Sequence, residues 1–166
     1  MKNPDFCVTV VDVALVEDRD EVNWQTLHDL LHRTYAYMDG RIDPPSSLHR
    51  LTVEGLQQKA ADESLIVARD KGAIVGCMFC RREGDWLYVG KVAVDLSAQG
   101  QGVGRQMFNH AFDLARTLAC RGLELETRVE LLENHRTFAR MGFVKVGEDA
   151  HQGFDQPTSI RMRATL

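Results

Sequence analysis

The sequence predicts an α/β (α+β) fold in which a mixed, mainly antiparallel sheet of about seven strands is flanked by about four helices. Its apolar patterns follow the order strand, two helices, three strands, helix, strand, helix and two strands. The three central strands are joined by short polar turns that contain glycine, as in an antiparallel meander. The helices between the other strands favour a mixed sheet with helices on both faces.

The first part of the chain is predicted to form one strand and two helices. Residues 8–16 indicate a strand, and residues 21–37 indicate a helix. The apolar residues at helical spacing are Val22, Leu27, Leu30 and Leu31. Gly40 and a Pro-Pro pair then force a loop, after which Ser46 or Ser47 could cap a second helix that runs to about residue 61.

The later elements follow from changes in the apolar period. Residues 64–94 contain the meander, with turns at RDKG and REGD. From Val103 the apolar residues fall on one helical stripe, which we expect to end at Gly122 because glycine favours the left-handed conformation of a helix cap. The last predicted elements are a strand at 123–129, a helix at 131–141 and strands at 143–148 and 158–166.

The composition indicates one globular domain spanning residues 1–166. The net charge is -4, and the sequence shows no linker and no internal repeat. It lacks the basic excess that nucleic-acid binding usually requires. No apolar run approaches the roughly 18 residues of a membrane span, and the apolar N-terminal stretch lacks a signal-peptide cleavage site. We therefore expect a cytoplasmic protein with no nucleic-acid or membrane partner.

The cysteines are Cys7, Cys77, Cys80 and Cys120, each in an apolar stretch. Free cysteines in a reducing compartment behave as small hydrophobic residues. Cys77 and Cys80 form a C-x-x-C pair, but residues three apart on a strand point to opposite faces and are poorly placed to hold one metal ion. We favour buried thiols over a metal or redox site and predict no metal.

The stretch SAQGQGVGRQ, residues 97–106, places three glycines between an apolar strand and a helix. Glycine permits left-handed backbone and removes the Cβ atoms that would hold a ligand away from the amides. A helix start also presents unsatisfied N–H groups, which suit a phosphate or pyrophosphate. The spacing fits neither a P-loop nor the dinucleotide fingerprint. A tight turn without a ligand explains the glycines equally well.

The context of this turn resembles a known family. Gln99, Gly102 and Gly104 match the Q/R-x-x-G-x-G/A signature of the GNAT superfamily of N-acetyltransferases, and KVAVDLSAQGQGVGRQMFNHAF is similar to its acetyl-coenzyme A segment. The predicted element order is also similar to the family's, and FARMGFVKVGE resembles its closing helix and strand. The resemblance implies an acetyltransferase domain that moves an acetyl group from acetyl-coenzyme A to a primary amine by direct attack, without a metal.

The resemblance also implies how acetyl-coenzyme A binds. The amides from Gln99 to Arg105 would wrap the pyrophosphate, Val94 would pair with the pantetheine arm, and the Val92 N–H would face the thioester carbonyl and stabilise its oxyanion. Asn134 could contact the cofactor or cap the last helix. The expected cofactor-binding residues are Val92, Val94, Gln99, Gly100, Gln101, Gly102, Val103, Gly104, Arg105 and Asn134.

The resemblance leaves the proton-transfer groups open. Family members often carry a tyrosine where this chain has Phe138. Tyr88 occupies the place of a glutamate base in histone-acetylating relatives, and strand alternation predicts that it shares a face with Val92. Glu126 and Glu130, near the end of the following strand, are further candidates for the base that deprotonates the amine. Alternatively, Tyr88 is a buried core residue, and Glu126 and Glu130 are ordinary surface carboxylates.

The loop from Tyr35 to His49 is where such folds usually build the acceptor wall. Its candidate acceptor-binding residues are Tyr35, Tyr37, Asp39 and Arg41. The loop carries both acids and bases, so the charge of the acceptor does not follow from it; a proline-stiffened, solvated connection is the alternative. We expect a small-molecule or peptide amine as the acceptor, and the sequence leaves a homodimer open.

Two other function classes compete with the enzyme. A non-catalytic module that binds acyl-coenzyme A would keep the glycine-rich turn and lack transfer chemistry, and Phe138 favours this alternative. A nucleotide-binding protein could use the same glycines, but the chain lacks the Lys-Ser/Thr pair of a P-loop and an evident acidic metal site.

Overall fold

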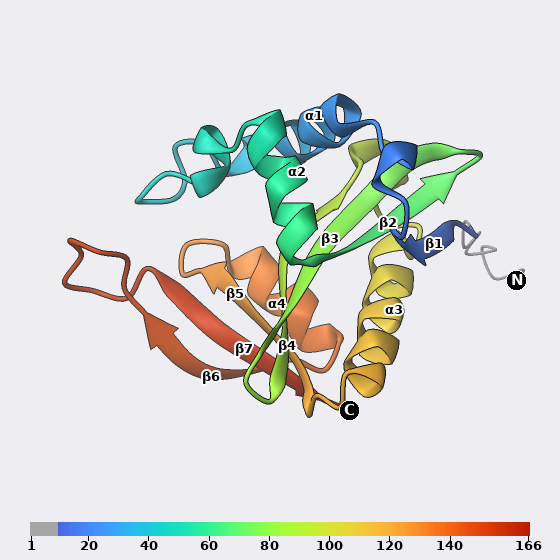
Figure 1. Cartoon of the computed structure of the whole chain (residues 1–166). Coiled ribbons are helices and arrows are strands. Elements are labelled where there is room, and N and C mark those ends of the chain that lie inside the picture. Colours follow the sequence, from blue (N-terminus) through green and yellow to red (C-terminus); the bar gives the residue numbers. More distant parts are fainter. Residues whose placement is uncertain (1–9) are drawn as a thin grey trace, which may run out of the picture.

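A computed structural model describes residues 10–166, and Figure 1 shows how its elements are arranged. One seven-stranded sheet has the order β1-β2-β3-β4-β5-β7-β6. Neighbouring strands pair antiparallel, except β4 and β5, which are parallel. The predicted mixed, mainly antiparallel fold is therefore confirmed. Cys7 and residues 8–9 of the first predicted strand lie outside the described residues.

The helices and strands occur in the order that the sequence predicts. The strands are β1 Asp12–Leu15, β2 Ser64–Asp70, β3 Ala73–Glu83, β4 Trp86–Val94, β5 Gly122–Arg128, β6 Val144–Asp149 and β7 Ser159–Thr165. The helices are α1 Trp24–Tyr35, α2 Val53–Asp62, α3 Val103–Thr117 and α4 Leu132–Arg140. Short 3-10 turns lie at η1 Arg19–Glu21, η2 Ala36–Met38, η3 Ser47–Arg50 and η4 Leu96–Ala98.

Both N-terminal helices begin later than predicted because capping side chains set their starts. The Asn23 side chain accepts a hydrogen bond of 3.0 Å from the Thr26 amide and starts α1. The Thr52 hydroxyl accepts one of 3.0 Å from the Gly55 amide and starts α2. The second predicted helix is thus divided into η3 and α2 at Leu51, whose backbone is extended.

Two hydrophobic cores lie on opposite faces of the sheet. One is packed by α1 and α2, with Leu27, Leu30 and Leu31 among its residues, and the other by α3 with flanking contacts from α4 (Figure 1). Cys77 belongs to the first core and Cys80 to the second, so the two thiols point to opposite faces of β3 as predicted.

The end of α3 differs from the prediction. The helix ends at Thr117, Leu118 is its C-cap, and the left-handed residue that follows is Ala119, with a φ of 54°. Gly122 instead opens β5, where a Cβ would lie 2.1 Å from the Ala164 carbonyl oxygen of β7. The glycine is required by this close backbone approach, which sequence alone does not distinguish from a helix cap.

We expect Gly122→Ala to lower the free energy of unfolding by at least about 3 kcal/mol, because a Cβ there overlaps main-chain atoms that cannot rotate away. Gly147→Ala in β6 is the matched control, since its Cβ would meet only the Arg161 side chain, at 3.5 Å. We expect the control to change stability by less than about 1 kcal/mol. Urea unfolding measures both, and equal stability of the two variants would contradict the close approach of β5 and β7.

Candidate active site

Strands β4 and β5 pair only at their first three residues. The pairs are Trp86 with Gly122, Leu87 with Leu123 and Tyr88 with Glu124. Beyond this point β5 stays paired with β7 up to Arg128, while the part of β4 after Tyr88 keeps only β3 as its partner within residues 10–166. One edge of β4 is therefore open to a ligand that can hydrogen-bond to backbone.

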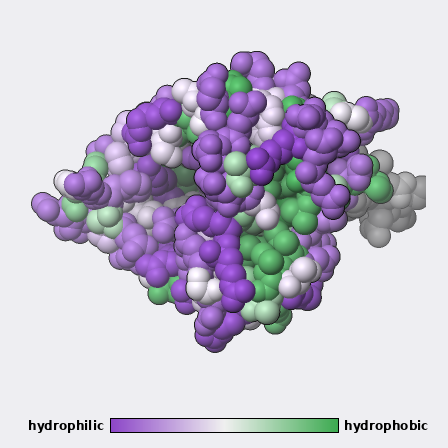
Figure 2. Space-filling view, in the orientation of Figure 1, coloured by the Kyte–Doolittle hydropathy of each residue, from purple (hydrophilic) through white to green (hydrophobic). Residues whose placement is uncertain are grey.

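The separation of the strands opens a cleft of about 1330 Å³. Its lining combines β4, the end of β5, the glycine-rich turn, one side of α4 and the loop before η3. Figure 2 shows the hollow between the part that carries α1 and α2 and the part that carries β5 to β7. A cleft of this size is large enough for a cofactor arm and a second substrate together.

A β-bulge in β4 changes the expected placement of Tyr88. Gly90 pairs with Phe79 and Ala93 with Cys77, so two residues of β4 oppose one residue of β3. The bulge includes Lys91, which has a φ of 50°.

The strand therefore changes phase between residues 90 and 93. Val89 and Val92 both pack on the α3 side of the sheet, and Tyr88 lies on the α1 side. The prediction that Tyr88 shares a face with Val92 is wrong, because strict alternation is interrupted here. Tyr88 still lines the cleft.

The peptide of Val92 is fixed by Tyr35. The Tyr35 hydroxyl donates a hydrogen bond of 2.8 Å to the Val92 carbonyl. Burial raises the pKa of Tyr35 well above its usual value, so the hydroxyl stays protonated and remains a donor. Tyr35, an expected acceptor-binding residue, thus holds the backbone of β4 in place beside the cleft.

The glycine-rich turn has the left-handed backbone that its sequence predicts. Gly100 has a φ of 75° and Gly102 a φ of 80°, and Gly102 is the N-cap of α3. A Cβ on Gly104 would lie 3.8 Å from the Val94 side chain, so this face of the first turn lies close to β4. The first turn of α3 contains no acidic residue. Residues of the glycine-rich turn line the cleft, so the positive end of the α3 dipole faces it.

The turn is held at its start by Asp95. Its carboxylate accepts hydrogen bonds of 3.0 Å from the Ser97 amide and 2.6 Å from Arg33 Nη2. These contacts, led by the Ser97 amide, lower the pKa of Asp95. The Gln99 side chain donates to the Val94 carbonyl at 3.1 Å and ties the turn back to the strand.

Tyr88 and Glu126 form the titratable pair at the point where the strands separate. Burial, and then the charge of Glu126, raise the pKa of Tyr88 to about 12. Burial and the nearby Asp149 raise the pKa of Glu126, which suits a carboxylate that must accept a proton. Glu130 lies outside the cleft lining, and its carboxylate accepts a hydrogen bond of 2.9 Å from the Asp43 amide.

The loop between α1 and η3 is tied to the end of β5 and to α4 by long-range contacts. Arg41 forms an ion pair of 2.7 Å with Glu133. The Asn134 side chain donates to the Tyr37 hydroxyl at 3.1 Å, so Asn134 contacts the loop and leaves α4 without a side-chain cap. The loop therefore forms one wall of the cleft, over the region where β4 and β5 separate.

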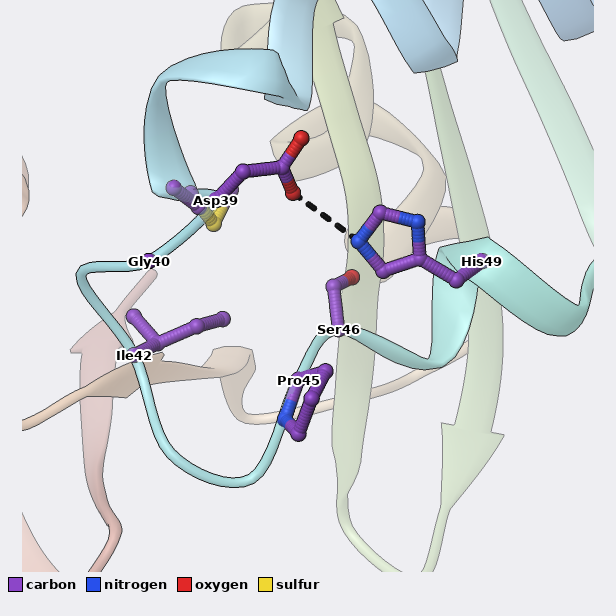
Figure 3. Close-up of a pocket in the computed structure, with 7 residues that line it drawn as sticks. Asp39, Gly40, Ile42, Pro45, Ser46 and His49 are labelled. Carbon is purple, nitrogen blue, oxygen red and sulfur yellow. Dashed lines mark hydrogen bonds and ion pairs between the residues drawn. The ribbon is translucent and has the colours of Figure 1, made fainter.

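A smaller cavity of about 290 Å³ lies within this loop. Figure 3 shows the Asp39 carboxylate pointing toward the His49 ring, with Pro45 and Ser46 on the adjoining stretch of chain. The Asp39 oxygen and His49 Nε2 are 2.9 Å apart. Both side chains are about half exposed, so the pair holds the two ends of the loop together from the solvent side.

Phe138 belongs to a cluster of three aromatic rings. Its ring centroid lies 6.1 Å from Phe108 and 5.9 Å from Phe143, both edge to face. Phe138 also lines the cleft, on the same face of α4 as Asn134 one turn earlier. The Tyr37 hydroxyl therefore lies on the face of α4 that carries Phe138.

The cleft also contains basic residues that the sequence did not single out. Arg50, Lys91 and Arg128 line it and make no ion pair within residues 10–166. The alternation of β5 places Arg128 on the face of Glu126 and could have identified it. Lys91 was missed because its bulge depends on the pairing of β4 with β3.

No group of three or more His, Cys, Asp or Glu side chains within residues 10–166 is placed to hold a metal ion. No helix in this range is long and apolar enough to cross a membrane.

Comparisons with known proteins agree with this geometry. The model of the acetyltransferase (GNAT) family matches residues 24–143. An IAA acetyltransferase of Azospirillum brasilense is 30% identical over 129 residues, which cover 76% of this chain and 82% of that protein.

Solved structures show the same fold. The IAA acetyltransferase from Bacillus cereus ATCC 14579 has a TM-score of 0.66 at 16% identity and covers 95% of this chain and 100% of that one. The PaiA N-acetyltransferase from Thermoplasma acidophilum, in complex with coenzyme A, has a TM-score of 0.73 at 11% identity, with 93% and 99% covered.

The chain belongs to the GNAT family of acetyltransferases. It is an acyltransferase of the class that uses acetyl-coenzyme A.

Proposed function

We propose that this protein transfers the acetyl group of acetyl-coenzyme A to a primary amine in a ternary complex. The observation that carries the proposal is the cleft between β4 and β5, with a glycine-rich helix start at one end and the Tyr88–Glu126 pair at the other. The first feature suits a pyrophosphate and the second suits an amine that must lose a proton. No covalent intermediate on the protein is needed.

The residues present fit acetyl-coenzyme A. The left-handed glycines of the 99–105 turn and the positive end of α3 support a pyrophosphate there. The open edge of β4 at Val94 supports pairing with the amide groups of the pantetheine arm. The Val92 carbonyl, held by Tyr35, belongs to the Val92–Ala93 peptide and anchors β4 next to the Val92 N–H that would face the thioester carbonyl.

We assign Glu126 as the base that accepts a proton from the amine. The protonated amine gives one proton to Glu126, and its nitrogen forms a bond to the thioester carbonyl carbon. The carbon–sulfur bond then breaks, the nitrogen loses its second proton to solvent, and the coenzyme A sulfur takes up a proton. Glu126 is suited to its part because burial and Asp149 raise its pKa toward neutrality.

We assign the proton donor for the coenzyme A sulfur to Tyr37. Its hydroxyl accepts from the Asn134 side chain at 3.1 Å, so its own proton can point elsewhere. Its distance to Asn134 Oδ1, 3.5 Å, is long for a hydrogen bond. Because it lies on the face of α4 that carries Phe138, Tyr37 would replace the hydroxyl that Phe138 lacks.

Gly102→Glu tests the cofactor site. For the unchanged protein, acetyl-coenzyme A at about a hundredfold excess over its Kd should raise Tm by roughly 5–10 °C. In the variant a carboxylate would occupy the phosphate position, and the shift should vanish. Gly84→Glu is the matched control, because Gly84 also has a positive φ of 57° and lies in the β3–β4 turn.

The same melts are paired with an assay of thiol release and acetylated product over a panel of amines. A full Tm shift in Gly102→Glu would contradict the placement of the cofactor. A Tm shift in the unchanged protein without transfer to any amine would support a module that only binds acyl-coenzyme A.

Tyr37→Phe tests the proton donor. We expect kcat to fall roughly hundredfold while the KM for acetyl-coenzyme A stays unchanged, because a general acid contributes to the transition state. The double variant Tyr37→Phe/Phe138→Tyr should recover part of kcat by returning a hydroxyl to α4. Wild-type kcat in the single variant would remove Tyr37 from the mechanism.

A further inference from the structure

The charge of the cleft is opposite to the charge of the chain. The chain has a net charge of -4, yet six Lys and Arg residues and only two Glu residues line the cleft. One of the two acids, Glu133, is paired with Arg41. Glu126 is therefore the one lining carboxylate without an ion pair in the described part of the chain.

Some of the lining cations are neutralised locally. Lys59 and Arg81 both pair with Glu63, and Arg81 also pairs with Glu83. Arg105 lies in the glycine-rich turn, at the cofactor end. What remains is a basic cluster of Arg50, Lys91 and Arg128 on the acceptor side.

The basic cluster surrounds one short segment of the acceptor loop. Lys91 Nζ donates to the Ser47 hydroxyl at 2.9 Å, and Arg128 Nη2 lies 3.4 Å from the Pro45 carbonyl. Arg128 Nη1 is buried and has no hydrogen-bond partner among residues 10–166. A guanidinium with one long hydrogen bond and one unsatisfied nitrogen has donors left for a ligand, since buried donors are normally paired.

The charges of the cluster are only partly compensated by nearby acids. Burial lowers the pKa of Lys91, and the neighbouring Lys59, Arg128 and Arg50 charges lower it further, against the opposing effect of Glu63. Burial likewise lowers the pKa of Arg128, against the opposing charges of Glu130 and Asp43. A bound anion would relieve this mutual repulsion and would satisfy the unpaired guanidinium nitrogen.

Two lining residues of opposite charge lie on one strand. Glu126 and Arg128 are two residues apart on β5, and the buried Thr127 lies between them. Alternation therefore puts the two charged side chains on the same face, about 7 Å apart at the backbone. A carboxylate followed by a guanidinium at this spacing matches a small molecule with an amine at one end and an acid group at the other.

Resting on the function proposed above, we propose that the acceptor is a small amino acid or similar amine that carries a free carboxylate. The Glu126 side chain receives its amine, and Arg128, with Lys91 and Arg50, binds its carboxylate. A planar guanidinium with free donors favours a carboxylate because it can bind both oxygens at once.

Matched acceptors test this assignment. Acetyl transfer is followed by thiol release and by mass spectrometry for a series of α-amino acids and β-alanine, each against its own amide. We expect the best amino acids to exceed their amides in kcat/KM by about tenfold or more, because the amides lose the charged contact. Equal or faster transfer to the amides, or preference for phosphoethanolamine over every amino acid, would overturn the proposal and leave the acetyltransferase function intact.

Variants locate the effect at Arg128. Arg128→Gln should raise the KM for the amino acid about tenfold or more and leave the KM for its amide and for acetyl-coenzyme A unchanged. Arg128→Lys should retain part of the preference. Arg116→Gln is the control, because Arg116 lies on α3 outside the cleft and its one ion pair within the described residues is with Asp113. An equal loss of acetyl-coenzyme A affinity in Arg128→Gln would assign the cluster to the cofactor and overturn the proposal.

A binding measurement covers the case in which no acceptor in the series is turned over. N-acetyl amino acids and their amides are titrated calorimetrically into the protein loaded with coenzyme A. Binding of the acids that weakens in Arg128→Gln supports the proposal, and equal or absent binding of both sets overturns it. Failure of coenzyme A itself to bind would instead refute the proposed function.

Discussion

Strands β4 and β5 share backbone pairing over three residue pairs, and the site exists because they then separate. The pairing is fixed at its start, where Gly122 lets β5 approach β7 at a distance that no side chain would allow. The pairing ends after Tyr88, where β5 stays paired with β7 and β4 with β3. The cleft between them is thus a consequence of sheet geometry, and the open edge of β4 has no strand partner in the described structure.

The rest of the site supplies chemistry to this opening from separate parts of the chain. The glycine-rich turn brings the positive end of α3 to one end of the cleft. The end of β5 brings Glu126 and Arg128, and the bulge in β4 brings Lys91. The loop from Tyr35 to His49 closes the remaining side, held by contacts to residues that lie more than eighty positions later in the sequence.

The sequence predicted the parts whose signals are local. The change of apolar period identified the elements and their order, and the glycine spacing identified the turn that opens α3. Alternation correctly separated Cys77 from Cys80, because β3 is regular at that point. The same rule failed for Tyr88, because an extra residue in β4 shifts the phase and nothing in the local sequence marks it. The role of Gly122 was misread for a related reason, since the constraint comes from β7, about forty residues away. The contacts between the 35–49 loop and α4 could not be predicted from the sequence either, because they join segments far apart in the chain.

Hydrogen–deuterium exchange with and without acetyl-coenzyme A tests the central claim most directly. If the ligand occupies the separation between β4 and β5, amides in segments 92–94 and 99–105 should exchange more slowly by about tenfold or more, while those of β6 stay unchanged. Binding that protects another segment and leaves 99–105 as it was would contradict this account.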